Sequence, residues 1–351
     1  MVTKGFAPLS AVGERPLDAL GRAVSDLRIS VIDRCNFRCS YCMPFDEYPW
    51  IPKEQILSYE EITRIARIMV TLGVEKIRLT GGEPLVRPRL NDLVSQLSEI
   101  EDLQDLCLTT NGSLLEKQAS ELRAAGLRRI NVSIDTLDPE KFRRITRRGE
   151  LAEVLDGLFE AQRVGLAPIK INAVVERGLN DEDIIPLVEF AREHGVAMRF
   201  IEFMDVGNAN GWNPDKMVSK REILEVIHAR YPLVEIGRDK GNAPSVDYHF
   251  LDGKGEVGII ASISEPFCSG CTRARLTADG KLVTCLFSNQ GFDLRGPLRD
   301  GTSDQELADI VRRVWRGRTD RYSELRLSQM NSSTGYQPRE HAKLEMITLG
   351  G

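Results

Sequence analysis

Short β-branched runs alternate with amphipathic stretches from residue 27 onward, and this alternation constrains the fold more than any other feature of the sequence. Strands are predicted at residues 27–32, 76–80, 105–110, 129–135, 169–175 and 197–203. Helices are predicted between them, among others at residues 58–73, 151–165 and 181–195. Ser58 and Glu61 have the spacing of a capping box at the start of the first helix. Consecutive strand and helix units imply parallel strands joined by crossover helices.

Such a parallel sheet is either a doubly wound open sheet or a barrel. The candidate functional residues favour the barrel, because they lie at or just after the C-terminal ends of different strands: Cys35, Gly81, Thr109, Ser133 and Met204. A barrel gathers the C-terminal ends of its strands on one face. We therefore predict an α/β fold, an incomplete (βα)6 barrel of the TIM type with an open side.

The alternation changes after about residue 215. One helix is predicted at 219–232, glycine-rich short strands at 233–263, and a second group of cysteines follows. We interpret this part as an α+β C-terminal extension that closes the barrel mouth. The chain is accordingly divided into a flexible lead-in at 1–21, a partial barrel at 22–215 and the extension at 216–351.

Composition excludes several classes of protein. The formal net charge of −5 argues against general binding of nucleic acid, which requires a basic face. No apolar run approaches the roughly 18 residues that a membrane span needs. The N-terminal segment lacks an apolar signal core, so we expect a cytoplasmic protein.

Seven cysteines are distributed as two groups of three plus Cys107, for which we expect a buried strand position. Cys35, Cys39 and Cys42 follow the first strand with the spacing C-x3-C-x2-C. Three thiolates can hold three irons of a [4Fe–4S] cube and leave the fourth iron open. A zinc site with a distant fourth ligand and three buried thiols remain the alternatives.

The second group has the spacing C-x2-C-x13-C, and no histidine lies close by. It consists of Cys268, Cys271 and Cys285, and again suggests a cube with an open iron. Arg273 and Arg275 occupy alternate positions, so an extended segment would point both guanidinium groups the same way. Guanidinium forks match phosphate oxygens, although a solvated basic stretch is the simpler alternative.

The first triplet, with Tyr41 before its last cysteine, resembles the motif of the radical S-adenosylmethionine superfamily. The TGGEP stretch from Thr80 to Pro84 follows at the expected distance. The CTRARL and CLF stretches and the terminal MITLGG narrow the resemblance, from about residue 22 to the end, to the GTP 3′,8-cyclase family (molybdenum cofactor biosynthesis protein A). The FDEYPW stretch after Cys42 departs from the family pattern.

The resemblance implies S-adenosyl-L-methionine (SAM) and two [4Fe–4S] clusters as cofactors, with one cysteine triplet for each cluster. It implies SAM contacts at Tyr41, Gly82, Ser133 and Met204. It implies GTP contacts at Arg28, Arg78, Thr109, Lys170, Arg199, Arg273 and Arg275. The residues that it implies for catalysis are Cys35, Cys39, Cys42, Arg273, Arg275, Gly350 and Gly351, the last two in a tail that threads into the barrel mouth.

The implied reaction converts GTP to (8S)-3′,8-cyclo-7,8-dihydroguanosine 5′-triphosphate, the first step of molybdenum cofactor biosynthesis. A 5′-deoxyadenosyl radical would abstract hydrogen from ribose C3′, and the carbon radical would add to guanine C8. Implied partners are an electron donor protein, a second copy of the chain, and cyclic pyranopterin monophosphate synthase as recipient of the product. A peptide-modifying radical enzyme and a zinc-stabilised binding protein are the alternative functions.

Overall fold

The computed structural model describes residues 15–332, 336 and 343–350. Within them lies one mixed sheet of 12 strands in the order β12-β11-β10-β1-β2-β3-β4-β5-β6-β9-β8-β7. The strands are β1 (Asp26–Ser30), β2 (Lys76–Thr80), β3 (Asp105–Thr110), β4 (Arg129–Ser133), β5 (Ile169–Val175), β6 (Ala197–Glu202), β7 (Leu233–Gly237), β8 (Val246–Phe250), β9 (Glu256–Ile260), β10 (Arg273–Leu276), β11 (Lys281–Val283) and β12 (Phe292–Asp293). The chain therefore has the predicted α/β class.

The predicted strands are present as β1 to β6, and each pairs in parallel with the next. Three of them end earlier than predicted, at Ser30, Ser133 and Glu202, because the chain leaves the sheet there to form loops. The glycine-rich strands predicted after residue 232 are β7, β8 and β9. β9 pairs with β6 and β10 pairs with β1, so the C-terminal part of the chain extends both edges of the parallel sheet.

The α-helices of the described residues are α1 (Tyr59–Thr71), α2 (Leu90–Ser98), α3 (Leu115–Ala124), α4 (Pro139–Thr146), α5 (Leu151–Arg163), α6 (Ile184–Glu193), α7 (Lys220–Arg230), α8 (Arg295–Arg299), α9 (Asp304–Arg316), α10 (Tyr322–Met330) and α11 (Met346–Leu349). The predicted capping box is present at α1, where Ser58 and Glu61 cap each other's backbone N–H groups. The helix predicted from residue 181 begins as α6 only at Ile184, because Asp181–Asp183 forms a 3-10 helix.

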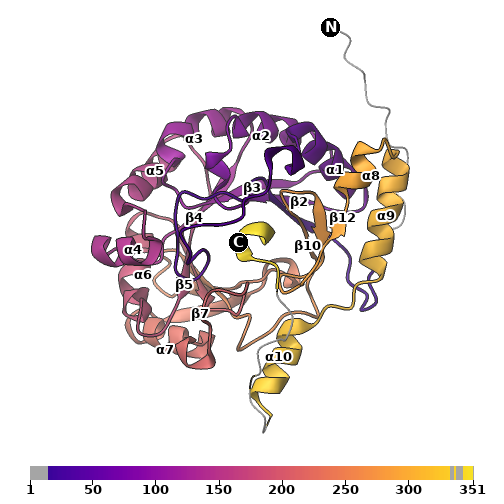
Figure 1. Cartoon of the computed structure of the whole chain (residues 1–351). Helices are drawn as coiled ribbons and strands as arrows, with labels where there is room; N and C mark the ends of the chain where they lie inside the picture. The colour runs from indigo at the N-terminus through magenta and orange to yellow at the C-terminus, as the bar shows by residue number, and fades with distance from the viewer. Residues whose placement is uncertain (1–14, 333–335, 337–342, 351) are drawn as a thin grey trace.

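The two faces of the parallel strands have different roles. In β5, Ile169, Ile171, Ala173 and Val175 are buried and alternate with the less buried residues of the other face. Figure 1 shows helices α1 to α6 on the outside of a strongly curved sheet, with the C-terminal segment near its centre. The apolar face of each strand packs against the outer helices, and the other face is directed toward the centre.

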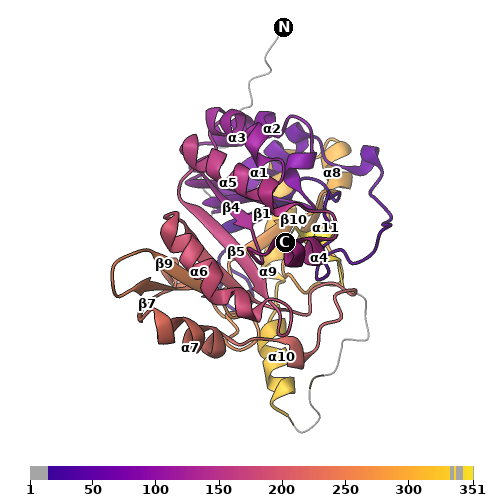
Figure 2. The ribbon, with the colours of Figure 1, turned by 90° about the vertical axis from the view of Figure 1, so that its left-hand side faces the viewer.

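Both ends of the described chain contact this framework. Figures 1 and 2 both place the C-terminal α11 beside β10. Residues 1–14 of the predicted lead-in lie outside the described residues. Asp18 belongs to the same predicted segment and is buried against Arg22 and Arg318.

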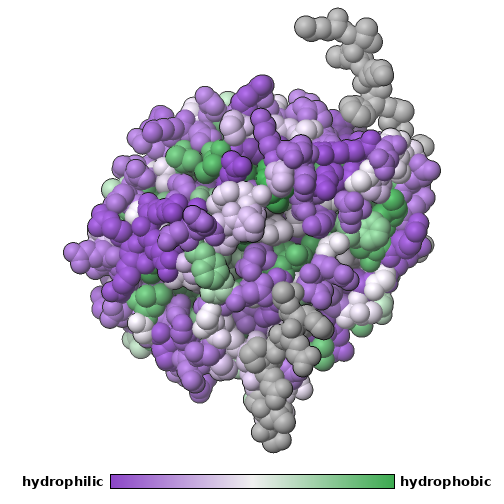
Figure 3. All heavy atoms as spheres, in the orientation of Figure 1, coloured by the Kyte–Doolittle hydropathy of each residue, from purple (hydrophilic) through white to green (hydrophobic). Residues whose placement is uncertain are grey.

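Figure 3 shows the face that is turned to the viewer in Figure 1. Hydrophilic side chains cover most of it, and apolar ones form separate small patches. No helix of the described residues has the length and the apolar character needed to cross a bilayer.

Candidate active site

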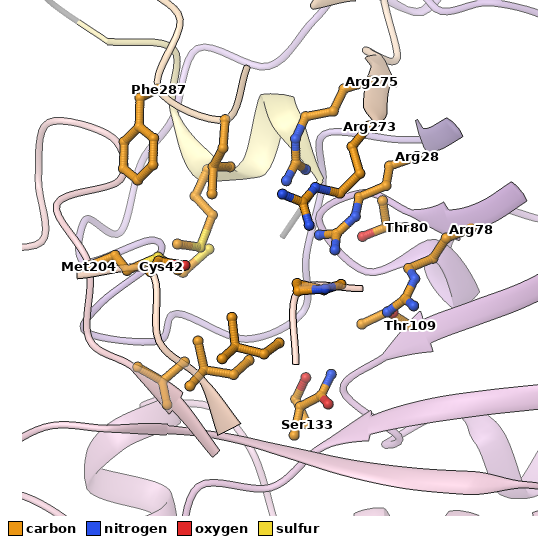
Figure 4. A pocket seen from close by; sticks show the side chains of 18 of the residues that line it. Arg28, Cys42, Arg78, Thr80, Thr109, Ser133, Met204, Arg273, Arg275 and Phe287 are labelled. Carbon is orange, nitrogen blue, oxygen red and sulfur yellow. The ribbon is translucent and has the colours of Figure 1, made fainter. Parts of the chain in front are cut away.

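A large cavity opens at the C-terminal ends of the parallel strands, and most predicted site residues line it. Figure 4 shows that they reach it from several elements and from opposite sides. The predicted residues that line the cavity are Arg28, Cys35, Cys39, Tyr41, Cys42, Arg78, Gly82, Thr109, Ser133, Arg199, Met204, Cys268, Cys271, Arg273, Arg275 and Cys285.

Lys170 does not line this cavity. It lies on the same face of β5 as Asn172 and Val174, which do, but closer to the N-terminal end of the strand. Its ammonium group is 3.4 Å from Glu256. Gly350 lies next to the cavity rather than in its wall, and Gly351 lies outside the described residues.

The first cysteine triplet lies on the loop that leaves β1. This loop is held against α4 by hydrogen bonds from the Arg38 and Ser40 N–H groups to the carbonyls of Thr146 and Ile145. The three cysteines are free thiols and line the same cavity. Burial raises the pKa of Cys35 to about 11, and the nearby Glu83 carboxylate adds to the effect. A bound cation would therefore be needed to keep this thiolate charged.

The FDEYPW stretch forms an aromatic cover beside this loop. The ring centroids of Tyr48 and Trp50 lie 5.6 Å apart, and the Arg38 guanidinium lies 5.4 Å from the Trp50 ring centroid. The same guanidinium donates to the Cys35 carbonyl at 2.8 Å. The stretch that departs from the family pattern therefore packs against the loop that carries the first triplet.

The second triplet has a different electrostatic environment. Two guanidinium groups donate to the Cys271 sulfur, from Arg273 at 3.1 Å and from Arg318 at 3.2 Å. Although burial opposes ionisation, the two arginines lower the pKa of Cys271 to about 7. Burial raises the pKa of Cys285 to about 12. The two guanidinium groups therefore favour the thiolate form of Cys271.

Both triplets fit iron–sulfur clusters better than single metal ions. Among the described residues, no three His, Cys, Asp or Glu side chains are grouped closely enough to hold one metal ion. Each cysteine of a cube binds a different iron, so its thiolates stand farther apart than those that share one zinc ion. Three free thiols at one cavity, with no disulfide between them, have the donor chemistry that a cluster requires.

Gly82 permits a close approach of two loops. Its N–H donates to the Ile32 carbonyl at 2.7 Å, and a Cβ at this position would overlap the Arg34 carbonyl. The strand end that carries Gly82 therefore packs directly on the loop that leads to the first triplet. Any residue larger than glycine would separate the two.

Sequence reasoning missed Glu83 in the same motif. Its buried carboxylate accepts hydrogen bonds from the Thr110 hydroxyl and the Asn111 N–H, both at 2.7 Å, and from the Leu85 N–H at 3.0 Å. Burial raises its pKa to about 7 despite these donors. A buried carboxylate beside the first triplet is suited to a cationic ligand group, and the acidic residue within the TGGEP stretch was the available signal.

Asp135 was also missed, although it follows the predicted strand that contains Ser133. Its carboxylate accepts from the Tyr41 hydroxyl at 2.7 Å and from the Val174 N–H at 2.9 Å. Burial raises its pKa to about 6. Asp135 thereby connects the cysteine loop to the ends of β4 and β5.

A row of three arginines crosses three adjacent strands. Arg275 of β10, Arg28 of β1 and Arg78 of β2 are direct neighbours in the parallel register. Figure 4 shows these side chains and Arg273 pointing into the cavity. Burial, together with the positive charges of Arg275 and Arg78, lowers the pKa of Arg28 well below its usual value. Like charges on neighbouring strands are destabilising, so the row is suited to an anionic ligand.

The tail reaches the same row. The Arg275 guanidinium donates to the carbonyls of Leu349 at 3.1 Å and Gly350 at 2.8 Å. Gly350 has a φ of 68°, and a Cβ there would overlap the Thr80 side chain. The tail thus depends on glycine for both its backbone conformation and its proximity to the cavity wall.

Comparison with known proteins identifies the family. A GTP 3′,8-cyclase of Xanthomonas axonopodis pv. citri is 48% identical over 338 residues, which cover 95% of this chain and 98% of that protein. The chain belongs to the GTP 3′,8-cyclase family. A family member from Staphylococcus saprophyticus subsp. saprophyticus is 43% identical, over 96% of this chain and 99% of that protein. The resemblance found from the motifs is therefore confirmed.

Two family models describe the chain in succession. The radical SAM superfamily matches residues 29–191, and Molybdenum Cofactor Synthesis C matches residues 196–324. As a radical SAM enzyme of the GTP 3′,8-cyclase family, the chain uses SAM and an iron–sulfur cluster.

Solved structures support the same fold. Streptococcus suis SuiB bound to S-adenosylmethionine has a TM-score of 0.58 at 17% identity, over 88% of this chain and 69% of that chain. SuiB bound to its precursor peptide SuiA also has a TM-score of 0.58, at 18% identity, over 82% of this chain and 66% of that chain. This likeness concerns the fold, whereas membership in the cyclase family rests on the sequence relatives.

Proposed function

We propose that the chain converts GTP to (8S)-3′,8-cyclo-7,8-dihydroguanosine 5′-triphosphate, with SAM and two [4Fe–4S] clusters as cofactors. One observation carries this proposal above the others. Two cysteine triplets and a row of arginines line a single cavity, in a chain that is 43% to 48% identical to proteins named GTP 3′,8-cyclase.

In this proposal Cys35, Cys39 and Cys42 would hold the first cluster and leave one iron open for the cofactor. A bound cluster would supply the electron for the reductive cleavage of SAM to methionine and the 5′-deoxyadenosyl radical. Tyr41, Gly82, Ser133 and Met204 form the proposed SAM contacts. The buried Glu83 carboxylate extends this set, because it is suited to the cationic amino group of the cofactor.

The proposed GTP site lies between the two triplets. Cys268, Cys271 and Cys285 would hold the second cluster, and its open iron would offer a ligand position for the guanine. The triphosphate binds among the arginines, which the row of like charges supports. The Arg78 guanidinium is 3.4 Å from the Thr109 hydroxyl, so both groups can address one ligand. Arg199 and Arg273 are the remaining proposed GTP contacts in the cavity wall. Lys170 lies outside this wall, so it would add positive charge nearby rather than contact GTP directly.

Positioning is the principal task of these residues. A ribose that is misplaced by about 1 Å would present the wrong hydrogen to the radical, at a cost of roughly 100-fold in rate. Phosphate contacts on one side and a guanine contact on the other would fix C3′ between them. The tail, through Gly350 and Arg275, would complete the wall beside the substrate.

The finer architecture belongs to the same proposal. We interpret β1 to β6 with their helices as an incomplete (βα)6 barrel, and residues 216–351 as an extension that closes its mouth. Residues 22–215 then form the barrel unit and residues 1–21 the lead-in. The inward position of α11 in Figure 1 supports this interpretation.

The proposed cellular context rests on the family. We expect a cytoplasmic homodimer that receives its electron from a donor protein. Its product passes to cyclic pyranopterin monophosphate synthase. Nucleic acid and membrane are not expected partners, in agreement with the net charge of −5.

The peptide-modifying alternative has less support. The chain shares its fold with SuiB, which has been solved with a precursor peptide. A neutral peptide backbone, however, would not explain why three neighbouring arginines face the cavity. The zinc-stabilised binding protein is disfavoured by the relatives, which are named as GTP 3′,8-cyclases.

Anaerobic incubation of the reconstituted protein with GTP, SAM and dithionite tests the function. The proposal predicts 5′-deoxyadenosine and the 3′,8-cyclised nucleotide in mass spectrometry, both dependent on GTP. Production of deoxyadenosine without a cyclised nucleotide would contradict the proposal. It would indicate a radical SAM enzyme that acts on another substrate.

Replacing Arg273 and Arg275 with alanine is expected to weaken GTP binding. Each lost charge-assisted hydrogen bond to phosphate costs on the order of 1.5 to 3 kcal/mol when the partner is desolvated. Equilibrium dialysis with GTP measures the loss, and iron analysis shows whether both clusters remain. Arg313 and Arg316, exposed on α9, provide the matched double variant, whose affinity should stay unchanged. Equal affinity in the two variants would refute the phosphate contact.

A further inference from the structure

The second cysteine triplet is held by a buried arginine that lies far away in the sequence. Arg318 is 4% exposed. One guanidinium nitrogen donates to the Cys271 carbonyl at 2.7 Å, and the other donates to the Cys271 sulfur at 3.2 Å. A single planar guanidinium group thus donates to both the backbone carbonyl and the sulfur of Cys271, a proposed cluster ligand.

Other buried groups fix this guanidinium in place. It lies 4.7 Å from the ring of Trp315, and the Trp315 indole N–H donates to the Arg22 carbonyl at 2.9 Å. Asp18 pairs with Arg318 at 3.3 Å and with Arg22 at 2.6 Å. Asp320 lies 3.5 Å from the Arg318 guanidinium. The N-terminal segment and the end of α9 therefore orient the donor toward the sulfur.

Arg273 also donates to the Cys271 sulfur, but its role differs. It points into the cavity, where the triphosphate is proposed to bind, so a ligand there competes for its guanidinium. Arg318 also borders the cavity, but its guanidinium is buried and paired with Asp18. The hydrogen bond from Arg318 therefore depends less on the substrate than the one from Arg273.

Among the described residues, no guanidinium donates to a sulfur of the first triplet, and Arg38 donates to the Cys35 carbonyl instead. The hydrogen bonds to the Cys35 sulfur come from neutral groups, the Phe37 N–H at 3.4 Å and the Asn111 amide at 3.8 Å. The carboxylates of Glu83 and Asp135 line the same cavity on the side of this triplet, so acidic rather than basic side chains accompany it. The two triplets therefore differ in the charge and the donors that surround their sulfurs.

We propose that Arg318 is a positioning residue of the second cluster, and that its hydrogen bond to the Cys271 sulfur raises the reduction potential of that cluster. The inference rests on the proposed function, because it requires a [4Fe–4S] cluster on the second triplet. Hydrogen bonds to ligand sulfurs stabilise the reduced cluster, which carries the larger negative charge. Asp18 and Asp320 balance the charges of Arg22 and Arg318, so the hydrogen bond carries the effect rather than net charge.

The test uses a protein that retains only the second cluster. Cys35, Cys39 and Cys42 are replaced with alanine, and the midpoint potential is measured by a redox titration monitored by electron paramagnetic resonance. In this background, Arg318→Met is expected to lower the potential. At the midpoint of the background protein, the ratio of oxidised to reduced cluster should rise about tenfold, which is 59 mV for one electron.

Arg22→Met is the matched control. Arg22 also pairs with Asp18 and donates to the carbonyl of a ligand, Cys268, at 2.7 Å, but it makes no hydrogen bond to a sulfur. Its removal leaves the same excess of one negative charge among Asp18, Asp320 and the remaining arginine, so the ratio should change less than threefold. Equal shifts in the two variants, or no shift in Arg318→Met, would overturn the inference.

Iron and sulfide analysis separates the possible failures. A background protein without iron and sulfide would refute the second cluster itself, and with it the inference. A loaded cluster with an unchanged potential would refute the role of Arg318 alone. Should Arg318→Met fail to bind a cluster, Arg318→Lys is titrated instead, because it keeps the charge but loses the fork. An unchanged potential in that variant would also overturn the inference.

Discussion

Replacing Cys35, Cys39 and Cys42 with alanine is expected to abolish the cleavage of SAM. The three free thiols are proposed to hold the cluster that reduces the cofactor, and they lie beside Glu83 at the cavity. Iron in the anaerobically reconstituted protein should fall from about eight to about four per chain, since each cube contains four irons. Chromatography of 5′-deoxyadenosine measures the loss of cleavage.

Cys107→Ala is the control for this prediction. Cys107 is completely buried on β3 and does not line the cavity, which agrees with the strand position expected from the sequence. This variant should keep its full iron content and its cleavage of SAM. Deoxyadenosine production by the triple variant would show that the first triplet is not the site of cofactor cleavage.

Removing the tail is expected to separate the two halves of the reaction. Deletion of Gly350 and Gly351 should spare both clusters and the cleavage of SAM, but it should lower the yield of cyclised nucleotide by about 100-fold. The deletion removes the Gly350 carbonyl, one of the two that Arg275 contacts beside the cavity, and it leaves the ribose less well positioned. Simultaneous quantification of deoxyadenosine and cyclised product measures the separation.

A point variant tests the same idea without shortening the chain. Gly350→Val introduces a Cβ that overlaps the Thr80 side chain, in a backbone conformation that costs other residues about 1 to 2 kcal/mol. Gly317→Ala is the control, because its Cβ would lie 3.5 Å from the nearest backbone oxygen, an ordinary contact. Normal cyclisation in Gly350→Val would mean that the tail has no part in positioning the substrate.

The sequence predicted those features of the fold that depend on local pattern. The β-branched runs predicted β1 to β6, and the alternation of Arg273 and Arg275 predicted that both reach the cavity. Residues after strand ends were expected on one face, and Ser133 and Met204 do line one cavity. These inferences succeed because side-chain direction in a strand follows a period of two residues.

Features that depend on distant contacts were not predictable in this way. Asp18 and Arg318 are 300 positions apart, and neither belongs to a motif that would pair them. The family resemblance implied Lys170 as a GTP contact, but the sequence did not show how far along β5 the cavity reaches. Glu83 belongs to the TGGEP stretch, yet its buried environment depends on Thr110 and Asn111 from the neighbouring strand end.

The most direct test of the account is the fate of the hydrogen at ribose C3′. The reconstituted protein is incubated anaerobically with SAM, dithionite and GTP that carries deuterium at C3′, and the 5′-deoxyadenosine is analysed by mass spectrometry. We predict that the deoxyadenosine contains a single deuterium, and that it contains no deuterium when the label is at C2′. Unlabelled deoxyadenosine from the C3′ substrate, or transfer from C2′, would contradict the proposed placement of GTP in the cavity.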